Sequence, residues 1–247
     1  MENHIVSSYD EELKFILRRI SEMGGHAERM VEQAVAALIR SDWGLAQSVV
    51  ADDILLDAAQ REIDERAIMT IAKRQPMAHD LREIVGAIRI SSDLERIGDL
   101  GKNIAKRVIA VHDHAQPIQL VRGIEHMSEL ALSQLKEVLD AYATRDHVRA
   151  EEIRTNDAEI DAMYTSIFRE LLTYMMEDPR NITSCTHLLF SAKNIERIGD
   201  HATNIAETIY YIQTGRQIET DRPKGDSTPS MTAPVPAGET LLADRGR

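Results

Sequence analysis

Apolar residues recur along this chain at spacings of three and four, the period of amphipathic α-helices, over long stretches separated by short polar breaks. The breaks fall at residues 41–44, 75–77, 113–117, 144–147 and 178–180. Three of the seven prolines, Pro76, Pro117 and Pro179, lie in these breaks, where a missing N–H costs little and a new helix can begin. The pattern predicts six long helices and an all-α fold.

The same helical unit is present twice in the chain. When the sequence is shifted by 101 residues, residues 93–105 (DLERIGDLGKNIA) align with residues 194–206 (NIERIGDHATNIA), and 8 of the 13 positions are identical. Further upstream the offset becomes 104, which pairs Asp42 with Asp146. Repetition on this scale, with short connections inside each half, predicts two tandem homologous three-helix bundles with antiparallel neighbours.

The repeat and the local composition divide the chain into three parts. We expect residues 1–114 to form the first bundle, residues 115–215 the second, and residues 216–247 a C-terminal tail. Four prolines gather in that tail among Ser, Thr, Gly and Ala. Because such a segment cannot bury enough apolar surface to fold, the tail is expected to be disordered.

Composition supports the helical fold and excludes several classes of protein. The chain is 43% hydrophobic but only 4% aromatic, which suits helices better than a turn-rich β architecture. The single cysteine, Cys185, rules out an intrachain disulfide and a cysteine-based zinc site, and it suits a reducing cytoplasm. No apolar run approaches the roughly 18 residues of a membrane-spanning helix, and no export signal opens the chain. A soluble cytoplasmic protein is expected.

Charge narrows the choice of partners. The net charge is −12, and it belongs to the folded body, because five basic and five acidic residues cancel from residue 216 onward. An acidic field repels phosphate backbones and anionic lipid. We therefore expect no binding to nucleic acid and no membrane insertion, with cations or basic patches on proteins as the partners.

Acidic pairs at i and i+4 are the candidate chemistry of the chain. Glu95 and Asp99 lie on the predicted third helix, nearly opposite its apolar packing seam, and Asp53 and Asp57 lie on the second helix. A hairpin that turns at Pro76 brings the two pairs level, because Pro76 is midway between Asp57 and Glu95. Four carboxylates at one level repel strongly unless a cation lies between them.

The second half repeats this arrangement around the hairpin at Pro179. The predicted metal ligands are therefore eight carboxylates: Asp53, Asp57, Glu95, Asp99, Asp157, Asp161, Glu196 and Asp200. Oxygen-only ligands favour Mg, Mn or ferric iron, with Zn or Ni as further candidates in vitro. Without a metal, the acids would form an exposed face paired with Arg96 and Arg197, and the motif glycines would mark close helix packing.

Two other interpretations stay open at this point. A carboxylate-bridged di-metal enzyme of the ferritin type needs Glu-x-x-His motifs on core-facing positions, and neither acidic site has one. His201 directly follows Asp200 and so points about 100° away from it, which makes it a bystander. No phosphate-binding loop or catalytic triad order stands out, so neither catalysis nor an organic cofactor is expected. The other alternative is a metal-free helical scaffold.

These motifs resemble those of the PhoU family, the accessory regulators of phosphate systems, over about residues 9–214. The carriers are KRQP at 73–76, DLR at 80–82 and the two ERIGD motifs at 95–99 and 196–200. The resemblance implies two three-helix bundles packed side by side, with metal held in some members by Glu/Asp-x-x-x-Asp motifs, which here fall on the eight carboxylates named above. Asp93 becomes Asn194 in the second copy, so the resemblance leaves open whether the two sites are equivalent.

The resemblance also implies a function. A member of this family is expected to be a cytoplasmic, non-enzymatic regulator that reports phosphate sufficiency. It would contact the membrane sensor histidine kinase and the ATPase of the phosphate ABC transporter, keep the phosphate-starvation response off and limit uptake. A homodimer is the expected assembly. An acidic, rigid bundle without a pocket motif suits such protein contacts.

Overall fold

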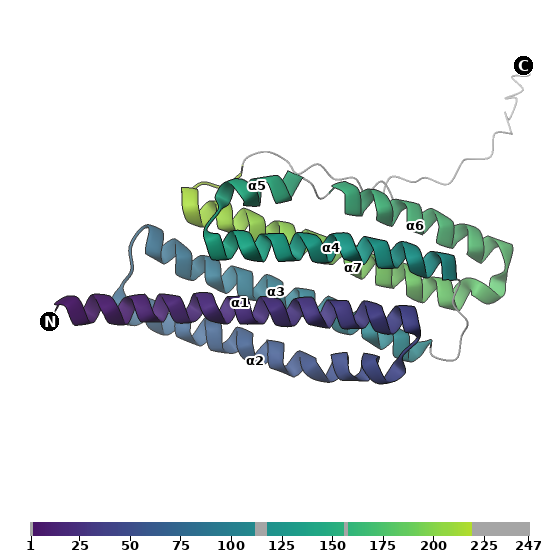
Figure 1. Ribbon diagram of the computed structural model, residues 1–247, viewed down its shortest axis with the longest axis horizontal. Helices are drawn as coiled ribbons and strands as arrows, with labels where there is room; N and C mark the ends of the chain where they lie inside the picture. The colour runs from purple at the N-terminus through teal and green to yellow at the C-terminus, as the bar shows by residue number, and fades with distance from the viewer. Residues whose placement is uncertain (1, 112–117, 156–157, 219–247) are drawn as a thin grey trace, which may run out of the picture.

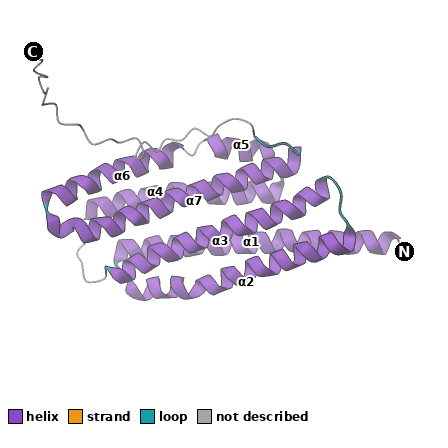
Figure 2. Ribbon diagram, turned by 180° about the vertical axis from the view of Figure 1, so that it is seen from behind, coloured by secondary structure: helices purple, strands orange, loops and turns teal. Residues whose placement is uncertain are grey.

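The computed structural model describes residues 2–111, 118–155 and 158–218. Within these residues all regular structure is helical (Figure 2). The helices are α1 (Glu2–Arg40), α2 (Trp43–Arg74), α3 (His79–Ala110), α4 (Ile118–Thr144), α5 (His147–Thr155), α6 (Ala158–Glu177), the short 3-10 helix η1 (Pro179–Asn181) and α7 (Ile182–Thr214). The all-α prediction is confirmed, and no helix of the described part is long and apolar enough to cross a membrane.

Two bundles lie against each other, with α1 to α3 in one and α4 to α7 in the other (Figure 1). Neighbouring helices within each bundle run antiparallel, so the predicted tandem three-helix bundles are confirmed. The predicted boundary near residue 114 falls in residues 112–117, outside the described residues. Most of the predicted disordered tail, residues 219–247, lies outside them as well.

The middle helix of the second bundle is described in two parts, α5 and α6, and residues 156–157 between them lie outside the described residues. Counted as one middle helix, the two parts complete the six long helices that the apolar spacing predicts.

Matching turns begin the middle helix of each bundle. Asp42 and Asp146 each accept a hydrogen bond through Oδ1 from the backbone N–H three residues later, at 2.9 and 3.0 Å. Such a cap satisfies a donor that the first helical turn leaves unpaired. The residues just before them, Ser41 and Arg145, have φ angles of 52° and 58°. The offset of 104 therefore aligns equivalent turns.

The core of each bundle is the apolar seam of its third helix. The seam residues are buried in both copies: Ile90, Leu94, Ile97, Ile104 and Val108 on α3, and Ile195, Ile198, Ala202, Ile205 and Ile209 on α7. Helices α3 and α7 also pack against each other along the interface between the bundles, and α1 packs against α4 (Figure 2). The two acidic motifs thus lie on the central helices of the molecule.

The bundle interface is not symmetric at the repeat positions. His201 Nδ1 on α7 lies 2.8 Å from Asp93 Oδ1 on α3. The equivalent positions in the other copy are Leu100 and Asn194, and both are buried. The positions that form a polar pair in one half of the interface are therefore a buried leucine and a buried asparagine in the other half. His201 has its partner outside the predicted metal ligands.

Candidate acidic sites

The first acidic site consists of Asp53 and Asp57 on α2 and of Glu95 and Asp99 on α3. The antiparallel hairpin brings the two pairs together. Lys102 Nζ donates to Asp53 Oδ2 at 2.6 Å and to Asp99 Oδ1 at 2.5 Å, so one ammonium group joins the two helices. Its own pKa is raised: burial acts to lower it, but the hydrogen bonds to both carboxylates outweigh that effect.

The three other carboxylates of the first acidic site raise the pKa of Glu95. Burial raises the pKa of Glu95, and the charges of Asp99, Asp57 and Asp53 raise it further against the opposing charge of Arg96. The guanidinium of Arg96 lies 3.5 Å from Glu95 and 3.6 Å from Asp99, and its side chain is largely exposed. An exposed ion pair of this kind contributes little, so the carboxylates of the site retain a net negative charge.

The motif glycine allows the two helices to approach closely beside the acids. A methyl group on Gly98 would overlap Leu56 Cδ2 of α2. Leu56 is fully buried and is close in sequence to both Asp53 and Asp57. The packing interpretation of this glycine is therefore supported, and the same close approach positions the carboxylates of α2 against those of α3.

The second acidic site is more deeply buried. It consists of Asp161 on α6 and of Glu196 and Asp200 on α7, while Asp157 lies outside the described residues. Asp161 is 3% exposed and Glu196 is 6% exposed. Lys193 Nζ lies 2.9 Å from Glu196 Oε2 and also 4.8 Å from the centre of the Tyr164 ring. A lysine again supplies the nearest positive charge.

The electrostatics of Glu196 repeat those of Glu95. Burial raises the pKa of Glu196, the hydrogen bond from Lys193 opposes that rise, and the charges of Asp200 and Asp161 add to it. Acids from two helices therefore act on one buried carboxyl in each bundle. This is the grouping that the repeat predicted for the described members of the two sites.

The lysines were missed at the sequence level. Lys102 follows Asp99 by three residues, and Lys193 precedes Glu196 by three, so both lie on the same helix face as their acids. Their equivalents in the other copy are Thr203 and Ser92, so the repeat does not reveal them. Acid-to-lysine spacing on one helix was the signal that could have found them.

The metal role of the eight carboxylates stays a prediction. Among the described residues, one group of three His, Asp or Glu side chains has ligand atoms within 4.8 Å of one another: His79, Asp80 and Glu83 at the start of α3. Glu83 there pairs with Arg145 of the other bundle at 2.7 Å. In the first acidic site the ammonium group of Lys102 lies between Asp53 and Asp99, and in the second Lys193 pairs with Glu196. An all-oxygen donor set with surplus negative charge suits a hard cation in place of the lysine.

Comparisons with known proteins agree with the repeat. The protein-family model of the PhoU domain matches the sequence at residues 20–108 and again at residues 124–209. A phosphate-specific transport system accessory protein PhoU homolog of Rhizobium meliloti (strain 1021) is 68% identical over 92% of this chain and 96% of its own length. A homolog of the same name from Caulobacter vibrioides (strain NA1000 / CB15N) is 52% identical over 92% of this chain and 98% of its own.

Two solved structures share the fold. The crystal structure of PhoU from Pseudomonas aeruginosa has a TM-score of 0.81 and 38% identity, and it covers 84% of this chain and 100% of its own. The phosphate transport system regulatory protein PhoU from Streptococcus pneumoniae has a TM-score of 0.79 and 26% identity, and it covers 86% of this chain and 100% of its own.

Proposed function

The chain belongs to the PhoU family, and from this premise we propose that it is a cytoplasmic, non-enzymatic regulator of phosphate homeostasis. It contacts the sensor histidine kinase and the ATPase of the phosphate ABC transporter, represses phosphate-starvation signalling and limits uptake. The observation that carries this proposal is the 68% identity, over 92% of the chain, to a phosphate-specific transport system accessory protein. Relatives named as accessory proteins do not favour the di-metal enzyme.

The surface of the bundles supports a role in protein contact. The first acidic site lies at the edge formed by α2 and α3, with Asp53 and Glu95 only partly buried. A hard metal ion held by Asp53, Asp57, Glu95 and Asp99 would lower their net negative charge and supply a Lewis acid for an oxygen ligand of a partner. Lys102 would have to leave, because its ammonium group now lies between Asp53 and Asp99. We propose an equivalent role for Asp157, Asp161, Glu196 and Asp200.

The regulatory role is tested by deleting the gene and following a phosphate-starvation reporter in phosphate-rich medium. The reporter should switch on in the deletion strain and switch off again when the wild-type gene is restored. Unchanged repression in the deletion strain would contradict the proposal. Partners co-purified from the restored strain with the full chain should include a histidine kinase and a transporter ATPase.

The metal role has a separate test. The quadruple substitution Glu95→Ala, Asp99→Ala, Glu196→Ala and Asp200→Ala should abolish bound metal in elemental analysis of the purified protein. A matched control removes four exposed acids away from the sites, Glu11, Glu65, Glu129 and Glu151. Equal metal content in the wild type and the quadruple variant would contradict the metal role, and the metal-free helical scaffold would then be the remaining interpretation.

A further inference from the structure

The outer face of α2 lacks charge over its first half. Helical geometry places one row of exposed side chains away from the bundle core: Trp43, Gly44, Gln47, Ala51, Ile54, Leu55 and Ala58. Ile54 is 64% exposed and Leu55 is 57% exposed. A shallow groove along the start of this row is lined by Gly44, Gln47, Ser48, Val50, Ala51 and Ile109. We call these residues of α2 the α2 face.

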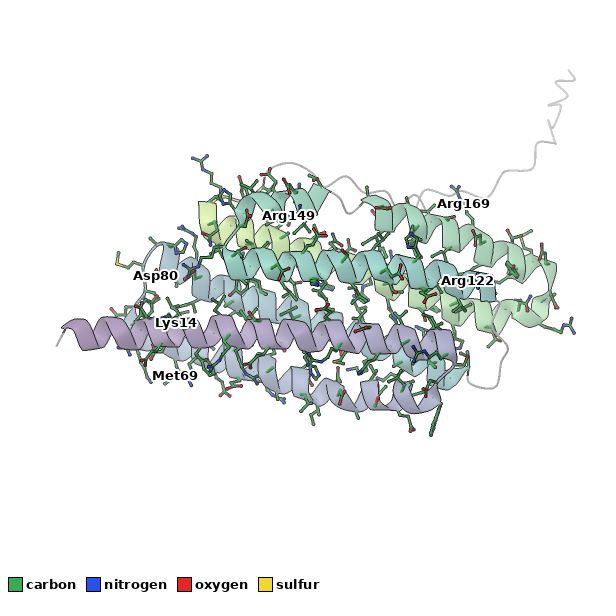
Figure 3. The ribbon with its side chains drawn as sticks, viewed as in Figure 1. Lys14, Met69, Asp80, Arg122, Arg149 and Arg169 are labelled. Atoms are coloured by element: carbon green, nitrogen blue, oxygen red, sulfur yellow. The ribbon has the colours of Figure 1, made fainter. Side chains whose placement is uncertain are left out.

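The second bundle shows that the fold does not require an apolar face here. At the offset of 104, the positions of Gln47 and Leu55 carry the exposed acids Glu151 and Glu159. The two middle helices lie on opposite outer edges of the molecule (Figure 1). Figure 3 labels Met69 on α2 and Arg149 on α5 at these two edges. Since charged residues are accepted at the equivalent positions of the second bundle, packing within a bundle does not explain the exposed Leu55 on the α2 face.

Exposed apolar side chains gathered on one face are typical of an interaction surface, whereas single ones need no explanation. Ile54 and Leu55 are adjacent, Trp43 lies three turns earlier on the same row, and Trp43 is itself 43% exposed. An apolar row about 22 Å long, bordered by a groove with small residues, matches the apolar stripe of a helix laid along it. The shape thus fits a helical partner.

The charge around the α2 face indicates which kind of partner helix fits it. Between residues 43 and 58 the chain has three acids, Asp52, Asp53 and Asp57, and no basic residue. The first acidic site borders the α2 face on the side of α3, with Glu95 adding to the negative charge. A second copy would bring like-charged borders together, and an anionic lipid surface would be repelled. A helix with basic flanks is complementary to these borders.

We propose that the α2 face is a docking surface for a basic amphipathic helix of a partner protein. Ile54 and Leu55 pack into the apolar stripe of that helix, while the carboxylates at both borders meet its Lys or Arg side chains. The inference rests on the proposed function only because that function requires protein partners. It adds the surface and the chemistry of the partner segment that the surface accepts.

Binding is tested with the full chain and two synthetic helical peptides of the same leucine stripe, one with lysine flanks and one with glutamate flanks. Trp43 is the only tryptophan, so its emission reports occupancy directly. The lysine peptide should shift the emission to shorter wavelength, and the glutamate peptide should bind at least about tenfold more weakly. Equal affinity for both peptides would overturn the proposed charge selection.

The surface itself is tested with Ile54→Ser/Leu55→Ser. Each buried apolar side chain contributes about tenfold in affinity, so the double variant should bind the lysine peptide about a hundredfold more weakly. Val148→Ser, on the equivalent helix of the second bundle and 58% exposed, is the matched control and should bind as the wild type does. Both variants change exposed side chains and should keep the wild-type melting temperature.

Three results would overturn the proposal. The first is equal peptide affinity of the wild type and Ile54→Ser/Leu55→Ser. The second is a wild-type dimer that this variant converts to a monomer, which would make the α2 face a self-interface. The third is a shift of Trp43 emission with anionic lipid vesicles and with neither peptide, which would point to a membrane surface.

The cellular assay separates this inference from the proposed function. Ile54→Ser/Leu55→Ser should fail to restore repression in the deletion strain, while Val148→Ser should restore it. If deletion leaves the reporter silent, the regulatory role fails. If deletion switches the reporter on and Ile54→Ser/Leu55→Ser restores full repression, the regulatory role stands and the docking surface fails.

Discussion

The first acidic site lies at an open edge of its bundle, where the side chains of Asp53 and Asp99 are 15% and 29% exposed, whereas the side chain of Glu196 in the second site is 7% exposed. Each site has its own lysine, placed after the motif in one and before it in the other. The same acidic motif is thus paired with a lysine at two different positions of its helix. A pair of partly buried carboxylates favours a nearby positive charge, but it does not determine which residue of the helix supplies that charge.

The largest change in the free energy of unfolding should come from removing the lysine of the second acidic site. Lys193→Met should lower the free energy of unfolding by about 2–3 kcal/mol in metal-free buffer at neutral pH, because Glu196 is left charged in a buried place. Urea unfolding monitored by circular dichroism measures this value. The control Lys106→Met removes an exposed lysine and should change stability by less than about 0.5 kcal/mol.

A smaller loss is expected at the open site. Lys102→Met should lower the free energy of unfolding by about 1–2 kcal/mol, because water reaches Asp53 and Asp99 once their shared donor is gone. The same variant should bind a divalent cation more tightly than the wild type if the first acidic site is a metal site. A loss as large as that of Lys193→Met would show that exposure does not govern the comparison, and calorimetric titration with Mn²⁺ tests the second expectation.

The comparison also shows how far the sequence could predict the structure. The helix period and the repeat predicted both bundles, and the position of Pro76 midway between Asp57 and Glu95 predicted that the two acid pairs meet. Lys102 and Lys193 were not found, because each is present in one copy of the repeat only and the prediction followed the repeated acids. The contact of Lys102 with Asp53 on the neighbouring helix depends in addition on the side-chain rotamer, which the sequence does not specify.

An intermediate change in the free energy of unfolding is expected at the polar pair of the bundle interface. His201→Leu places a leucine beside Asp93, and it should lower the free energy of unfolding by about 1 kcal/mol, because the partly buried carboxylate keeps only its longer contact, 3.4 Å, with Asn204 Nδ2. Adding Asp93→Asn reproduces the Leu100 and Asn194 arrangement of the other half and should recover most of that loss. A double-mutant cycle measures the coupling between the two positions. Additive effects would mean that the 2.8 Å contact between His201 and Asp93 contributes nothing to stability.

The smallest effects concern Glu196 and Glu95 and their pH dependence. Because the folded pKa of each carboxyl is raised, the folded state binds more protons than the unfolded chain, and stability falls as pH rises from the unfolded value of 4.5 through the folded value. In metal-free buffer Glu196→Gln should therefore be more stable than the wild type at neutral pH, by less than about 1 kcal/mol, and the difference should vanish in acid.

Glu95→Gln should show the same sign with a smaller amplitude, because Glu95 is 16% exposed and Glu196 is 7% exposed. Thermal unfolding of the three proteins from acid to neutral pH measures both differences. Added Mn²⁺ should reverse the sign at a site that binds metal, because the carboxylate is then the stabilised form and glutamine is a poorer ligand. An unchanged sign at both sites with excess Mn²⁺ would mean that the lysines, and not a metal, are the resident cations of the two acidic sites.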